Sequence, residues 1–201
     1  VSDLRVVVKS KTFLGLCAGI AFIFSGFCFA GAEDGEASGA LNSGGYKNYP
    51  EGEKTSVSLF LGKPDRIPMD ALLVDLLDAI NFISKYKIPN FLPNVQFVPS
   101  EVVEAYACGK PCKALAVYRA GEGVYINEEM NPETNVFARS VLLHELVHFV
   151  QDINRELASV RDCERWYRRE QEAYAIQKRF LEMIGSQIRV AYSAGDACPG
   201  E

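Results

Sequence analysis

The sequence predicts an α+β fold built around a small mixed sheet, and two features of its pattern predict this. Apolar residues recur at helical spacing in the stretches 68–83, 135–155 and 160–184. Apolar and polar residues alternate as in strands at 94–99 and on both sides of a glycine-containing turn near residue 122, which indicates a β-hairpin. The chain of 201 residues contains no internal repeat, so its length fits one domain with an added leader.

The first expected element is a short strand at Ser56–Gly62. A helix then begins near Pro68 and ends before Pro89. Its apolar residues at helical spacing are Leu72, Leu73, Leu76, Leu77, Ile80, Phe82 and Ile83. A strand follows at Asn94–Pro99, and Ser100 is expected to cap a short helix after it.

The hairpin consists of two strands, at 113–119 and 124–127, joined by a Gly-Glu-Gly turn at 121–123. Side chains alternate along the second strand, so Val124 and Ile126 should face the core.

Residues 1–32 are interpreted as a secretory signal peptide. A weakly basic start precedes an uncharged apolar run at 12–30, and the small residues Ala30-Gly31-Ala32 are of the kind that a signal peptidase prefers. The alternative is an uncleaved membrane anchor, because the run is just long enough to span a bilayer. Cleavage predicts an exported protein, periplasmic or secreted, with no stable membrane insertion. Residues 33–55 are rich in small and polar side chains and are expected to form a flexible linker, with the folded domain at 56–201.

The charge balance excludes one class of partner. The formal net charge of the whole chain is −5. The leader holds three of the 21 basic and one of the 26 acidic residues, so the remainder carries −7. Without a basic patch that could neutralise phosphates, nucleic acid is not expected as a partner. The sequence does not indicate an oligomeric state.

Four cysteines follow the leader, and an even number in an exported chain predicts two disulfides. Cys108 and Cys112 can close locally through the glycine- and proline-containing turn between them, which leaves Cys163 to pair with Cys198. Three pairings are possible in principle. A four-cysteine zinc site is disfavoured, because the C-x₃-C spacing is awkward for zinc and export favours oxidation.

The most informative stretch is His144-Glu145-Leu146-Val147-His148, an H-E-x-x-H pattern that contains both histidines of the chain. It lies in a helix expected to follow a turn and cap at 131–134 and to continue to about Arg155. Residues four apart share one helix face, so both imidazoles can reach one ion, and Zn²⁺ accepts such pairs readily. Glu145 projects from nearly the same side, placed to deprotonate water rather than to bind the ion. The alternative is an ordinary buried helix whose histidines are satisfied by neighbouring groups.

A catalytic zinc site needs a third protein ligand, and no histidine is left to supply it. The apolar stripe of the helix at 160–184 consists of Trp166, Ala173, Phe180 and Ile184. Glu170 falls inside this stripe, where an acid is costly unless a cation pairs with it, so Glu170 is the predicted ligand. Glu172 lies at the edge of the stripe and is the rival. The alternative is that Glu170 pairs with an arginine or is exposed on a helix of different phase.

The His144-Glu145-x-x-His148 motif is followed 22 residues later by Glu170-x-x-Ala173, and together they resemble the gluzincin group of zincin metallopeptidases. The resemblance covers about residues 113–184 and is closest in kind to small exported bacterial proteins of zincin type. It implies a zincin-like fold in which the hairpin supplies an edge strand above the active-site helix. It also implies Zn²⁺ held by the two histidines and Glu170, with Glu145 as the general base. Many gluzincins carry Asp or Asn one residue beyond the alanine, where this chain has Tyr174.

The activity implied is that of an exported zinc metallopeptidase, in which Glu145 takes the proton of the attacking water and passes it to the leaving amine. An extended peptide could pair with this edge strand, at 124–127, which favours a peptide or protein substrate. A phenol could support the developing oxyanion, and the candidates are Tyr125, Tyr167 and Tyr174. A zinc amidase acting on cell-wall peptides would use the same residues. A non-catalytic zincin-fold binding protein would bind the metal without turnover or keep only the fold. The presence of Glu145 argues against the latter.

Overall fold

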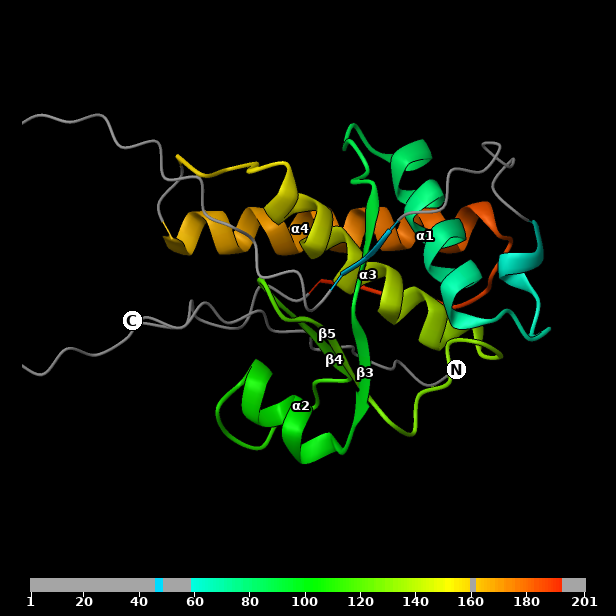
Figure 1. Cartoon of the computed structure of the whole chain (residues 1–201), viewed down its shortest axis with the longest axis horizontal. Helices are drawn as coiled ribbons and strands as arrows, with labels where there is room; N and C mark the ends of the chain where they lie inside the picture. The colour runs from blue at the N-terminus through cyan, green and yellow to red at the C-terminus, as the bar shows by residue number, and fades with distance from the viewer. Residues whose placement is uncertain (1–45, 49–58, 160–161, 193–201) are drawn as a thin grey trace, which may run out of the picture.

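The computed structural model describes residues 46–48, 59–159 and 162–192, and these form a mixed α+β structure (Figure 1). The predicted signal peptide and most of the predicted linker lie outside the described residues. The described elements are β1 (Tyr46–Asn48), the 3₁₀ helix η1 (Leu59–Gly62), α1 (Met69–Ile83), β2 (Phe91–Pro93), β3 (Val95–Val98), α2 (Ser100–Ala107), β4 (Ala116–Arg119), β5 (Gly123–Asn127), α3 (Val136–Ile153) and α4 (Asp162–Met183).

The predicted hairpin belongs to a three-stranded mixed sheet with the order β3-β5-β4. β4 and β5 pair antiparallel, which confirms the hairpin, and β3 pairs parallel with β5. Val124 and Ile126 are fully buried, as predicted. The prediction that residues 124–127 form an edge strand is wrong, because β5 is central and β3 and β4 are the outer strands. The hairpin pattern could not show this, since β3 is separated from β5 in sequence by α2 and β4.

Gly123 permits the close approach of β5 to the residue that precedes β3. Its φ is +117°, a backbone conformation that residues with a side chain rarely adopt. A Cβ atom at this position would lie 2.3 Å from the carbonyl oxygen of Asn94, and the backbone N–H of Val124 donates to that same oxygen at 2.8 Å. A larger residue at 123 would therefore separate two strands of the sheet.

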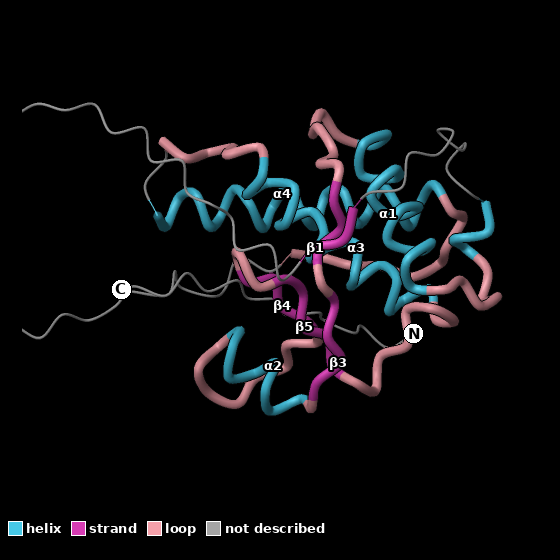
Figure 2. Tube along the Cα trace, in the orientation of Figure 1, coloured by secondary structure: helices cyan, strands magenta, loops and turns pink. Residues whose placement is uncertain are grey.

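A second, two-stranded sheet involves a part of the chain that the sequence did not predict to be ordered. Tyr46–Asn48, within the predicted linker 33–55, forms β1 and pairs antiparallel with β2 (Figure 2). The rest of that predicted linker lies outside the described residues. β2 was not expected either, because three residues that include Pro93 are too few to show an alternating pattern.

Helix α3 lies at the centre of the structure. It packs against β4 and β5 on one side and against α1 and α4 on the others, while α2 covers the opposite face of the sheet (Figure 1). Every residue from 138 to 151 is buried, as expected for a helix that is surrounded by other elements. Its N-cap is Asn135, one residue beyond the predicted turn, and the Asn135 side chain accepts a hydrogen bond from the N–H of Ala138 at 3.0 Å.

Two polar side chains fasten the segment before α1 to the start of α3. Glu133 accepts hydrogen bonds from the backbone N–H of Met69, the first residue of α1, at 2.9 Å and from Nε of Arg66 at 3.0 Å. Arg139 is fully buried in α3. Its guanidinium donates to the backbone carbonyls of Leu61, Lys63, Asp65, Pro132 and Glu133. These hydrogen bonds satisfy the buried charge of Arg139 and hold the segment 61–65 against the start of α3.

Helix α1 is confirmed, but three local expectations differ from the structure. The described part of the predicted strand Ser56–Gly62 is the 3₁₀ helix Leu59–Gly62, because this segment turns into the loop that Arg139 binds. Ser100 is the first residue of α2 and makes no capping hydrogen bond, since Pro99 occupies the N-cap position. Phe82 is 74% exposed on the outer face of α1.

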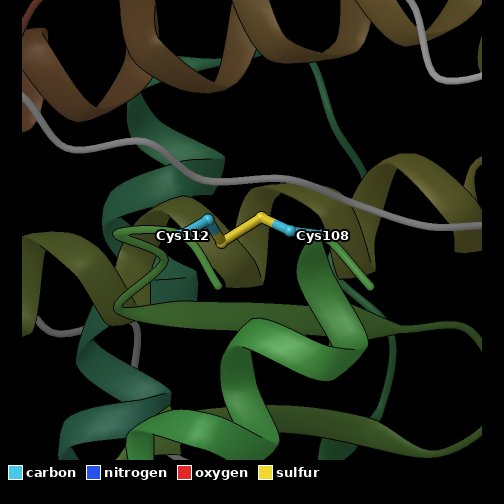
Figure 3. The surroundings of a disulfide bond; sticks show 2 residues. All are labelled: Cys108 and Cys112. Carbon is cyan, nitrogen blue, oxygen red and sulfur yellow. A yellow bond between two sulfur atoms is a disulfide. The ribbon is translucent and has the colours of Figure 1, made fainter. Parts of the chain in front are cut away.

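The cysteine prediction is confirmed for one pair. Cys108 and Cys112 are joined by a disulfide that closes the turn between α2 and β4 (Figure 3). Cys163 is also disulfide-bonded, and its predicted partner, Cys198, lies outside the described residues. Among the helices that the structure describes, none has both the length and the apolar character needed to cross a membrane.

Candidate metal centre

The two histidines and Glu170 meet at the interface between α3 and α4. These helices pack against each other, and α3 runs obliquely across α4 (Figure 1). One turn of α3 separates His144 from His148, which puts both rings on the face toward α4, and Glu170 projects from α4 into the same space. All three side chains are at most 1% exposed. Glu170 is buried as predicted. Of the predicted stripe, Ala173 and Phe180 are fully buried, whereas Trp166 and Ile184 are half-buried.

The distances between the three side chains fit a single ion. Nε2 of His144 and Nε2 of His148 are 3.2 Å apart. The Glu170 carboxylate oxygens lie 3.4 Å from Nε2 of His144 and 3.3 Å from Nε2 of His148. Ligand atoms at about 2.0–2.1 Å from a tetrahedral zinc ion are about 3.3 Å from one another. The group is therefore close enough to hold a metal ion.

The Glu170 carboxylate requires a positive partner. Both of its oxygens are buried, and neither receives a hydrogen bond. Burial by itself raises the pKa of Glu170, but the two imidazoles lower it to about 2, so the group stays ionised. Burial likewise lowers the pKa of His148, yet the Glu170 carboxylate raises it above its usual value. A proton or a metal ion has to supply the charge that this pair needs.

Glu145 lies next to the ligand group but does not belong to it. The side chain is fully buried, and its Oε2 accepts a hydrogen bond from the backbone N–H of Tyr118 in β4 at 2.7 Å. Its Oε1 is buried without a hydrogen-bond partner. Burial raises the pKa of Glu145, and the two imidazoles offset that rise only in part. A carboxyl group that is held by one oxygen and open at the other can accept and return a proton.

Two glutamines hold the outer nitrogens of the histidines, and the sequence analysis missed both. Nδ1 of His144 is 3.1 Å from Oε1 of Gln177, and Nδ1 of His148 is 3.0 Å from Oε1 of Gln151. Such partners orient metal-ligating imidazoles. A spacing signal was available, because Gln177 is seven residues after Glu170 and shares its helix face, and Gln151 is three residues after His148.

Comparison of the chain with protein-family models, with curated proteins and with solved structures finds no match. The site is therefore interpreted from its motif and its geometry.

Glu172, the rival ligand, is separate from the ligand group. Its Oε2 accepts hydrogen bonds from the hydroxyl of Tyr86 and from Nε2 of Gln151, the latter at 3.1 Å. The metal-holding group within the described residues contains Glu170 and not Glu172, in agreement with the predicted helix phase.

The three candidate tyrosines have different surroundings. The Tyr174 ring packs on His144 with centroids 4.6 Å apart, and it also packs on Tyr192. Tyr167 also packs on Tyr192. Tyr125 packs against α2 and donates its hydroxyl to Glu122, so it is engaged away from the histidines. Tyr174 is the candidate nearest to a ligand, and its role in supporting an oxyanion stays a prediction.

Proposed function

We propose that this protein is an exported zinc-dependent hydrolase of gluzincin type that cleaves peptide bonds. The observation that carries the proposal is the triangle of His144, His148 and Glu170, whose edges of 3.2–3.4 Å match a tetrahedral zinc site, next to a buried Glu145. Nitrogen and carboxylate donors in this combination are those of catalytic zinc sites, in which three protein ligands leave one position open.

Each residue of the site has a distinct role in this mechanism. His144, His148 and Glu170 would hold the ion. When bound, Zn²⁺ would supply Lewis acidity, which polarises a carbonyl group and makes water acidic enough to ionise near neutral pH. Glu145 accepts the proton of the attacking water on Oε1 and delivers it to the leaving nitrogen, while the N–H of Tyr118 keeps its carboxylate aimed at the site.

The substrate proposal follows from the position of β4. This outer strand lies against α3 and supplies the N–H that holds Glu145. An extended peptide that pairs with β4 would bring its carbonyl groups close to Glu145, which favours a peptide over a compact small molecule. This replaces the prediction that a peptide pairs with β5, whose two edges are both occupied in the sheet.

A competing proposal is a metal-binding protein without turnover. The observation in its favour is the burial of all three ligands to 1% or less, because a substrate must reach the ion. Glu145 distinguishes the two proposals. A purely structural site gains nothing from a buried acid that is costly to ionise and has one oxygen without a partner.

The test combines metal analysis with a hydrolysis assay. The purified protein should contain one Zn²⁺ per chain and should cleave either a denatured protein or cell-wall peptide fragments, which separates a peptidase from an amidase. Glu170→Gln should weaken zinc binding by about two to four orders of magnitude, since removing one partner of a buried charged group costs about 3–5 kcal/mol.

Glu164→Gln is the matched control for that variant. Glu164 is on the same helix, is about half exposed and pairs with Arg168, so the change should leave zinc binding within about twofold. A protein that refuses added zinc would overturn the proposal, and zinc binding without hydrolysis of either substrate would favour the binding protein.

A further inference from the structure

We propose that Glu172, together with Tyr86, is a positioning residue for the metal centre that acts on His148 through Gln151. The inference rests on the proposed function in one respect, because it treats His148 as a ligand. Tyr86 lies in the loop after α1, so the proposal adds a loop residue to the groups on α3 and α4 that orient the ligands. Gln151 is the only contact through which Glu172 and Tyr86 are argued to act.

The hydrogen bonds of Gln151 fix the orientation of its amide. Its Nε2 is 3.2 Å from the carbonyl oxygen of Arg169 and 3.1 Å from Oε2 of Glu172. A backbone carbonyl and a carboxylate only accept hydrogen bonds, so both must receive them from the NH₂ group of Gln151. The Gln151 oxygen therefore faces the other way, where Nε of Arg169 donates to it at 3.2 Å.

The orientation of the Gln151 amide in turn constrains the His148 ring. The same Gln151 oxygen lies 3.0 Å from Nδ1 of His148, and an amide oxygen accepts only. With an ion bound, Nδ1 would then carry the single proton of the ring, and the lone pair of Nε2 would face the space beside Glu170 and His144. This is the tautomer that a metal requires. Reversing the Gln151 amide would offer an N–H to Nδ1 and favour the opposite tautomer.

Glu172 provides a charged acceptor for the Gln151 amide. Hydrogen bonds to an ionised acceptor are roughly twice as strong as those between neutral groups, so Glu172 holds the Gln151 amide more firmly than a neutral acceptor would. Tyr86 is 2% exposed, and its hydroxyl donates to the same Glu172 oxygen. Tyr86 thus provides a second hydrogen bond that fixes the carboxylate.

The other histidine provides an internal comparison. Nδ1 of His144 faces Oε1 of Gln177, whose Nε2 donates to Oγ of Ser140 at 3.2 Å. The Ser140 hydroxyl in turn donates to the carbonyl of Phe137 at 2.8 Å, so this series ends on a neutral acceptor. Changes at Glu172 should consequently affect His148 and spare His144.

Nuclear magnetic resonance of the two imidazoles is the direct test. The chain has only two histidines, so a nitrogen–proton correlation spectrum of the labelled, metal-free protein contains four ring-nitrogen signals. Glu172→Leu should shift the two signals of His148 and leave those of His144 in place. Tyr86→Phe should shift the His148 signals in the same direction by less. Glu164→Leu, on the same helix and half exposed, should shift neither.

A double-mutant cycle separates positioning from general loosening of the fold. Gln151→Leu alone should weaken zinc binding by about 10–100-fold, the usual effect of losing an outer partner of a ligand, and Glu172→Leu by about tenfold. In the Gln151→Leu background, Glu172→Leu should add less than about twofold, because the residue through which it acts is gone. If Glu172→Leu does not fold, Glu172→Gln keeps the shape, removes the charge and should give smaller changes of the same sign.

The outcomes are distinct. The positioning role would be overturned if the His148 signals stayed in place in every Glu172 variant. It would also be overturned if Glu172→Leu weakened zinc binding as much in the Gln151→Leu background as in the parent. The two proposals can also fail separately. If the parent protein binds no zinc, the proposed hydrolase is overturned. If its His148 signals nevertheless shift in Glu172→Leu, and do not shift when Glu172→Leu is added to Gln151→Leu, the positioning of His148 by Glu172 is retained.

Discussion

Replacing Glu145 by glutamine should separate catalysis, metal binding and stability in one variant. The carbonyl of the introduced amide can still accept from the N–H of Tyr118, so the side chain should keep its place. Zinc binding should stay within about threefold, because Glu145 is outside the ligand group. Turnover should fall by about 10²–10⁴-fold, which is the usual contribution of a general base.

The stability of the metal-free variant should depend on pH in a way that identifies the buried acid. Burial raises the pKa of Glu145 in the folded state above its ordinary value of 4.5, so the unfolded chain releases this proton first as pH rises. The parent therefore loses stability between the two pKa values, by about 1.4 kcal/mol for each unit that separates them. Below about pH 4.5 the carboxyl is protonated in both the folded and the unfolded parent, so the difference between the two proteins should no longer depend on this group's titration.

Urea unfolding of both metal-free proteins at several pH values between 4 and 8 (roughly the range in which carboxyl and imidazole groups titrate) measures this difference. The free energy of unfolding of Glu145→Gln relative to the parent should rise with pH across that range. A difference that is independent of pH would mean that Glu145 does not ionise against its burial. Loss of zinc from the variant, or full retained turnover, would show that the assignment of base and ligand is mistaken.

Four further predictions concern other features of the molecule. Because Glu170 raises the pKa of His148, protons should compete with zinc for this side chain. Zinc affinity, measured against a chelator, should fall about tenfold per pH unit for each displaced proton as the pH drops through that pKa. An affinity that does not change with pH would contradict this. Replacing Cys108 and Cys112 by serine should cost about 2 kcal/mol of unfolding free energy, the entropy of a five-residue loop, and an unchanged denaturation midpoint would refute it. Arg155 is exposed with φ of 51°, so Arg155→Gly should stabilise the protein by about 1 kcal/mol, seen as a higher melting temperature. Tyr192→Ala should speed the extraction of zinc by a chelator and leave its affinity within about twofold; an unchanged rate would place the access route elsewhere.

The sequence predicts the elements whose signal is local. The hairpin, α1, α3 and α4 each carry a periodic apolar pattern, and the structure confirms them. The order of the sheet depends instead on a long-range parallel pairing between β3 and β5, for which no local pattern exists. The same holds for η1, whose shape follows from a buried Arg139 that reaches it from 78 residues away. Short strands such as β1 are stabilised by backbone pairing, which leaves no residue signature.

The candidate site shows the same division. The ligands were predictable because metal chemistry limits the residue types, and helical spacing places His144, His148 and Glu170. Gln151 and Gln177 were not found, because a glutamine within a helix is usually a solvated side chain. Their role becomes visible only when α3 and α4 are packed and every buried donor needs an acceptor.

Burial of the centre indicates which part of the molecule must move if the protein turns over substrate. Glu145 and both histidines are fully buried, and their positions depend on α3, α4 and β4, which share the core and should stay fixed. Tyr174 packs on His144, and Tyr192 packs on Tyr174 from the segment 186–192, which has no regular secondary structure. Segments of this kind open at lower free energy than packed helices. Displacement of Tyr192 would therefore uncover the Tyr174 ring that packs on His144, while the ligand triangle keeps its shape, so access and metal affinity should respond to different mutations.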